Sequence, residues 1–130
     1  MTVTALLLIT RKPTITPEEF KTHYETVHLP LIQRLAENDW PLSHKRTYIA
    51  RPAPGDDNSY PAAVLMGSQE DFSYDCITQV TFADEAGLRT FFARRMEPGT
   101  KEIIDADEEK FLVGEKVRVV LLGGEEETTK

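Results

Sequence analysis

A histidine beside a disturbed helix end is the first feature of this chain that could do chemistry. Tyr24 and His28 are four residues apart, so they share one face of a predicted helix, and Pro30 follows two residues later. Proline cannot donate the helical hydrogen bond and clashes with the carbonyl four residues earlier, at Thr26, so we expect a kink near His28. Because imidazole titrates near neutral pH, His28 is a candidate general acid or base for a ligand held there.

His28 also has a purely structural interpretation. Its ring could donate a hydrogen bond to a backbone carbonyl that Pro30 leaves free. From the residue types alone, the two interpretations are about equally supported.

A second group of polar side chains lies on a predicted strand, residues 43–51. His44, Arg46 and Tyr48 alternate with period two and therefore share one face of that strand. If this face points at the helices, His44 would be a second proton carrier, and Arg46 and Tyr48, with Tyr24, would bind the oxygens of a flat ring. A solvated edge strand with charged side chains is the alternative.

Tyr74 and Asp75 are weaker candidates for ligand binding. They begin the predicted strand 74–82, and either face of that strand could line a pocket. Asp75 could hold a histidine in its useful tautomer, as a carboxylate does in hydrolase triads. A turn or strand-end role is the commoner use of such an aspartate.

Three further ionisable residues are expected to stay outside the site. His23 is one position from Tyr24 and should point away from the Tyr24–His28 face. Asp105 and Asp107 stand in an acidic run, where helix capping or solvation is expected before catalysis.

The chain offers little for a metal or an organic cofactor, and we expect neither. The histidines, His23, His28 and His44, lack the i, i+4 spacing that places two metal ligands on one helical face. No glycine-rich phosphate loop follows a predicted strand. The single cysteine, Cys76, excludes an internal disulfide.

Composition narrows the function classes further. The chain has 130 residues and a formal net charge of −7, which fits one domain and argues against nucleic acid or an anionic membrane surface as partner. Its apolar amino-terminal run is too short to span a bilayer and has no basic residues before it. We therefore predict a soluble, cytoplasmic protein.

Hydrophobic periodicity predicts the order strand, helix, strand, strand, helix, strand. Thr16 is a natural N-cap for the first helix, with Glu19 completing a capping box. The predicted strands are 3–10, 43–51, 74–82 and 117–122, and the predicted helices are 17–36 and 85–95, with a further helical piece at 101–111. Residues 52–61 are a predicted loop, residues 1–122 one domain, and 123–130 a flexible acidic tail.

This order is that of an α+β fold, the ferredoxin-like βαββαβ antiparallel sheet with helices on one face. The apolar runs 6–9 and 119–122 do not alternate with polar residues, so both faces of these strands should be covered. Helices can cover only one face. We therefore expect a homodimer that packs sheet to sheet.

Four segments of the sequence resemble the EthD family of dimeric α+β barrels. They are Arg11-Lys12-Pro13 after the first strand, Thr16–Phe20 at the helix start, His28–Leu31 with its H-x-P element, and the Asp107–Phe111 segment. The resemblance is strongest to fungal polyketide-tailoring members, and the family's matching histidine favours the catalytic interpretation of His28.

The resemblance implies a tailoring enzyme that uses no cofactor. Its substrate would be an aromatic polyketide-like small molecule of secondary metabolism, and its chemistry cyclisation, dehydration or decarboxylation by proton transfer. Two alternatives remain open at this point. One is a non-catalytic small-molecule binding or stress-response module, and the other is a cofactor-free quinone-forming monooxygenase.

Overall fold

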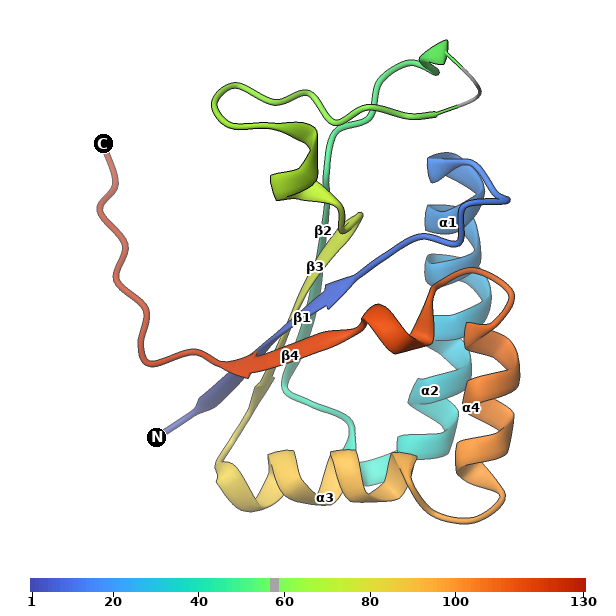
Figure 1. The fold of residues 1–130 in the computed structure, drawn as a ribbon. Coiled ribbons are helices and arrows are strands. Elements are labelled where there is room, and N and C mark those ends of the chain that lie inside the picture. The colour runs from blue at the N-terminus through green and yellow to red at the C-terminus, as the bar shows by residue number, and fades with distance from the viewer. Residues whose placement is uncertain (57–58) are drawn as a thin grey trace.

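A single antiparallel sheet with helices on one face forms the protein (Figure 1). The computed structural model describes residues 1–56 and 59–130. The strands are β1 (Val3–Ile9), β2 (Ser43–Tyr48), β3 (Cys76–Phe82) and β4 (Arg118–Leu121), in the spatial order β2-β3-β1-β4. The helices are α1 (Pro17–His23), a π-helical turn (Tyr24–His28), α2 (Leu29–Ala36), α3 (Glu85–Arg95) and α4 (Thr100–Glu108). The predicted ferredoxin-like fold and its βαββαβ order are confirmed.

Several predicted strands and helices extend beyond their observed ends. Strand β2 ends at Tyr48, short of residue 51, and β3 begins at Cys76 rather than at residue 74. Helix α4 ends at Glu108, before the predicted 111. The predicted loop 52–61 includes residues 57 and 58, which lie outside the described residues.

The first long helix begins as the capping box predicts. The Glu19 backbone N–H donates to Thr16 Oγ1 at 3.0 Å, and the Thr16 N–H donates to Glu19 Oε1 at 2.9 Å. Further along, the Leu29 N–H donates to the carbonyl of Tyr24, five residues earlier. Because Pro30 offers no N–H, the chain passes this point through a wider π turn. The helix was expected to kink near His28, and it instead changes there from α-helical to π-helical geometry.

Two apolar clusters fill the space between the sheet and the helices. The first contains Ile9, Phe20, Tyr24, Cys76, Phe111 and Leu112. The second contains Ala5, Val80 and Phe82, with Leu88, Phe91 and Phe92 packed against it. Members of both clusters line one pocket, so the core itself shapes the cavity described below.

The opposite face of the sheet carries apolar side chains as well. Ala5 and Ile9 are buried beneath the helices, so Leu6 and Leu8 point to the other face. Leu6 pairs with Val120, which is 55% exposed. Within the described part of the chain, no helix is long and apolar enough to cross a membrane.

Candidate functional site

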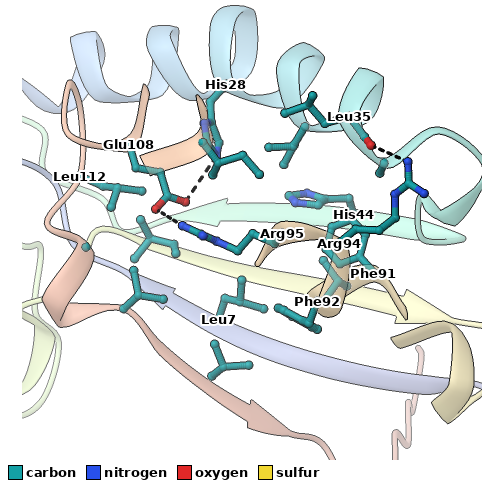
Figure 2. Close-up of a pocket in the computed structure, with 18 of the residues that line it drawn as sticks. Leu7, His28, Leu35, His44, Phe91, Phe92, Arg94, Arg95, Glu108 and Leu112 are labelled. Carbon is teal, nitrogen blue, oxygen red and sulfur yellow. Dashed lines mark hydrogen bonds and ion pairs between the residues drawn. The ribbon is translucent and has the colours of Figure 1, made fainter. Parts of the chain in front are cut away.

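A pocket of about 270 Å³ lies between the sheet and helices α2, α3 and α4 (Figure 2). Most of its lining is apolar, with Leu7 and Val80 from the sheet and Phe91 and Phe92 from α3. The polar side chains that line it are Tyr24, His28, His44, Arg94, Arg95, Thr100 and Glu108. An apolar cavity with a few polar groups is typical of a small-molecule site.

His28 lies on the wall of this pocket and is 5% exposed. Its Nδ1 is 2.8 Å from Oδ2 of Asp107, on α4. A carboxylate can only accept, so Nδ1 carries the proton and Nε2 keeps a free lone pair. Nε2 is 3.8 Å from Oε2 of Glu108, another lining residue. The structural interpretation of His28 expected its ring to donate to a backbone carbonyl left free by Pro30. The ring instead donates from Nδ1 to the carboxylate of Asp107.

Burial lowers the pKa of His28 below its ordinary value, because an imidazolium loses its hydration there. The hydrogen bond to Asp107 and the charge of Glu108 oppose this shift and raise the pKa. The ring is thus neutral near pH 7 and can accept a proton. The resulting imidazolium would lie between two carboxylates.

Asp107 has a second histidine partner. It is 6% exposed, and its Oδ1 is 3.1 Å from Nε2 of His23, whose ring stacks on Phe111. The predictions that His23 points away and that Asp107 is solvated are both wrong. Residues five apart diverge on an α-helix, but the wider π turn at Tyr24–His28 brings them close to one face.

His44 lines the same pocket from β2 but has a different environment. Its Nδ1 accepts a hydrogen bond of 2.8 Å from Nη1 of Arg46, so the remaining nitrogen, Nε2, carries the proton. Burial, with the neighbouring guanidinium, lowers the pKa of His44 to about 4. The ring stacks on Trp40 with a centroid distance of 5.3 Å. At neutral pH this histidine is an uncharged hydrogen-bond donor.

The other polar groups of β2 are directed at the helix above. Arg46 makes a two-point contact with Glu25, at 2.6 and 3.0 Å, and the Tyr48 hydroxyl donates to the same carboxylate. The Tyr24 hydroxyl is 2.9 Å from Thr78 Oγ1. β2 is an edge strand of the sheet, but this predicted face points at the helices and is not solvated. Its polar ends are largely occupied within the protein.

Tyr74 and Asp75 lie away from His28. Asp75 is 6% exposed, accepts from the Arg11 backbone N–H at 2.7 Å and is 2.8 Å from Nε of Arg51. The expectation that Asp75 could hold a histidine is therefore wrong. Tyr74 contributes its carbonyl to Arg51 Nη2 at 3.0 Å, and neither residue lines the pocket of His28. Asp75 and Tyr48 line a separate depression beside α1.

Metal binding has no support in the part of the chain that the structure describes. No group of three or more histidine, cysteine or carboxylate side chains there is arranged to hold a metal ion.

The fold and the site define an α+β domain that holds a histidine–aspartate pair at a pocket between its helices and sheet. Residues 12–115 match the EthD domain, and the chain belongs to this family. A curated relative is dehydratase ustZ of Ustilaginoidea virens, 28% identical over 102 residues that cover 78% of this chain and 68% of the relative.

Solved structures share the fold at low identity. SnoaB, a cofactor-independent oxygenase from Streptomyces nogalater, matches at 12% identity and a TM-score of 0.51, covering 99% of this chain and 98% of SnoaB. A dimeric ferredoxin-like protein of unknown function from Thermobifida fusca matches at 15% identity and a TM-score of 0.51, covering 94% and 90% of the two chains. At these identities the likeness concerns the fold alone.

Sequence reasoning missed Asp107 and Glu108 as parts of the site. A signal was present, because Ile104, Asp107 and Phe111 recur at helical spacing and all three are buried. An aspartate within an apolar helical stripe needs a buried partner, and the chain has few histidines to supply one.

Proposed function

We propose that this protein is a tailoring enzyme without a cofactor that dehydrates an aromatic or pre-aromatic polyketide-like small molecule. The observation that supports this most directly is the His28–Asp107 pair at the wall of an apolar pocket. Asp107 holds the proton on Nδ1, which leaves Nε2 as the base.

The proposed reaction is the loss of water from a β-hydroxy ketone. His28 Nε2 takes the proton from the carbon between the carbonyl and the hydroxyl-bearing carbon. The electron pair of that C–H bond forms the new C=C bond as the C–O bond breaks. The imidazolium returns the proton to the departing hydroxide, so water leaves and His28 is regenerated.

His44 is suited to a different part of the same reaction. Its Nε2–H can donate to the substrate carbonyl, where negative charge develops as the proton is removed. Because Arg46 occupies Nδ1, and burial with the charge of Arg46 keeps the ring neutral, His44 acts as a fixed donor and not as a second proton carrier. Tyr24 packs edge-to-face against both histidines, with centroid distances of 5.8 and 6.4 Å, and keeps them apart.

The comparison with ustZ, whose name is dehydratase, favours dehydration over cyclisation among proton-transfer reactions. Both reactions begin by removal of a proton beside a carbonyl, so the same base would serve either.

The test uses 4-hydroxy-4-phenylbutan-2-one as a model β-hydroxy ketone and follows the appearance of the conjugated enone. We expect His28→Asn to lower the rate by about 10²–10⁴, the usual contribution of a positioned proton carrier. The asparagine amide can still donate to Asp107, so the fold should survive. In the native protein, kcat/KM should fall on acidification only at a pH below the ordinary histidine pKa of about 6.5, because burial lowers the pKa at which His28 becomes protonated.

Gln33→Asn is a matched control on the exposed side of α2 and should leave the rate unchanged. Unchanged turnover in His28→Asn would remove His28 as the base. Binding of the hydroxy ketone without release of enone would favour the binding module instead.

We also propose that the protein is a homodimer that packs through the outer face of the sheet. Leu6, Leu8 and Val120 lie on this face, and Val120 is more than half exposed. The Thermobifida fusca structure with this fold is described as dimeric. Sedimentation equilibrium at micromolar concentration should give twice the chain mass, and Val120→Lys should shift it to the monomer. A native monomer would contradict the proposal.

A further inference from the structure

The two arginines that line the pocket are already neutralised by the protein. Arg95 Nη2 donates to Asp105 Oδ1 at 2.7 Å and to Glu108 Oε1 at 2.8 Å. Figure 2 shows Glu108 between His28 and Arg95, in contact with both. The Arg95 guanidinium, on the His28 side of the pocket, is therefore already paired with two carboxylates of the protein.

Arg94 is occupied at the other end of the pocket. Its Nη2 donates to the carbonyl of Leu35 at 3.0 Å, and its Nη1 is 3.2 Å from Oδ2 of Asp39. Glu37 is a further carboxylate, 3.7 Å away. In Figure 2 the guanidinium of Arg94 points toward Leu35 at the end of α2.

The remaining polar groups add negative charge rather than positive. His28 is bound to Asp107, and His44 is neutral at pH 7 because burial and Arg46 lower its pKa to about 4. Glu108 lines the cavity itself, 3.8 Å from His28 Nε2. Among the described lining residues, each cation thus has at least two protein acceptors, and a carboxylate faces the space next to the base.

We infer that the pocket selects an uncharged hydroxy ketone or phenol of one or two rings and excludes the corresponding carboxylic acid. This inference rests on the proposed function. An anion entering the cavity would lose its hydration without gaining a free cation, and Glu108 would repel it. The volume of about 270 Å³ is just below the roughly 300–1,000 Å³ usual for ligand pockets, which fits a small ring system.

Exclusion of carboxylic acids would distinguish between two reactions considered for this protein, decarboxylation and dehydration. Decarboxylation of a β-keto acid requires the substrate carboxylate to enter the pocket, whereas dehydration of a β-hydroxy ketone requires no charged group. The charges around Arg94 and Arg95 therefore favour dehydration.

The test compares two probes of nearly the same shape, 2-acetylnaphthalene and 2-naphthoate, by titration calorimetry at neutral pH. The methyl ketone and the carboxylate occupy similar volumes and differ chiefly in charge. We expect the ketone to bind at least about tenfold more tightly, a difference of about 1.4 kcal/mol.

Glu108→Gln sharpens the test. The glutamine oxygen can still accept from Arg95, but the negative charge beside the base is gone, so naphthoate binding should strengthen by at least about fivefold while ketone binding changes little. Glu109→Gln makes the same charge change at the next residue, which is exposed and outside the pocket lining, and should alter neither affinity.

The outcomes distinguish this inference from the proposed function. Equal or tighter binding of naphthoate by the native protein would overturn the selectivity and leave His28 chemistry intact, with decarboxylation as the better reaction. Failure of both probes to bind would overturn the ligand pocket and the proposed function with it. An equal gain of naphthoate affinity in Glu108→Gln and Glu109→Gln would show that overall charge, and not the pocket, sets the preference.

Discussion

His28 and His44 occupy the same pocket but have opposite electrostatic surroundings. Both rings are largely buried, both pack edge-to-face on Tyr24, and burial lowers the pKa of each. His28 has a carboxylate on Nδ1, from Asp107. His44 has a guanidinium there, from Arg46.

The difference fixes which nitrogen of each ring carries the proton. A carboxylate requires a donor, so His28 presents a bare Nε2 and the pKa-lowering effect of burial is partly offset. A guanidinium requires an acceptor, so His44 presents Nε2–H, and burial together with the charge of Arg46 lowers its pKa to about 4. Both rings are buried, so it is the partner on Nδ1, and not burial, that decides whether each histidine presents a base or a donor to the pocket.

The largest expected effect comes from exchanging the partner of His28. In Asp107→Asn the amide group can turn its NH₂ toward Nδ1, which would move the imidazole proton to Nε2 and abolish the base. We expect turnover to fall by about 10²–10⁴, as happens when a triad aspartate becomes asparagine and the wrong tautomer forms. The ¹⁵N shifts of His28 should report the change of protonated nitrogen.

A merely structural role for Asp107 predicts something different. Loss of its hydrogen bonds would lower the free energy of unfolding by about 1–3 kcal/mol and leave the tautomer and the pH–rate profile unchanged. If folded Asp107→Asn keeps the native tautomer of His28 and the native pH–rate profile, Asp107 does not act as a positioning residue.

Removal of His44 should have an intermediate effect, and its clearest readout is stability against pH. In the unfolded chain this histidine has a pKa near 6.5, whereas in the folded protein the pKa is about 4. As the pH falls between these values the unfolded state takes up a proton first, so the native protein loses up to about 3 kcal/mol. The loss is absent above pH 6.5 and complete below pH 4.

His44→Asn should remove most of this pH dependence. The asparagine oxygen can accept from Arg46 in place of Nδ1, so the network with Glu25 is retained. Urea denaturation at pH 7 and at pH 4.5 would measure the two stabilities, with Gln33→Asn on the exposed side of α2 as control. A variant that loses as much stability on acidification as the native protein would refute the assigned pKa. Turnover should fall by about 10² or more, the weaker limit for the loss of one oxyanion donor.

The fold was predictable because its signals are local. The capping box at Thr16, the apolar periodicity of the helices and the strand order all follow from neighbouring residues, and the structure agrees with them. Boundaries were less accurate at β3, where Tyr74 and Asp75 bind Arg51 and stand before the strand.

The site was only partly predictable, because its pairings join distant segments. Tyr24, His28 and His44 do line one pocket. Asp107 is separated from His28 by 79 residues, so the helical spacing of Ile104, Asp107 and Phe111 can indicate that Asp107 turns inward but not which residue it meets. His23 was misplaced for a different reason, since α-helical spacing does not hold across a π turn.

The smallest effect is expected at His23, which binds the other oxygen of Asp107. Its side chain is 20% exposed, so water can partly replace it in His23→Ala. Asp107 would keep its bond to His28 but lose one restraint on its rotation. We therefore expect turnover to fall less than about tenfold, which corresponds to less than about 1.4 kcal/mol. His23→Gln can place an amide N–H near the position of Nε2 and should restore most of the native rate. If His23→Ala lowered turnover as much as His28→Asn, His23 would take part in the proton transfer itself. The site would then contain three functional histidines in place of two.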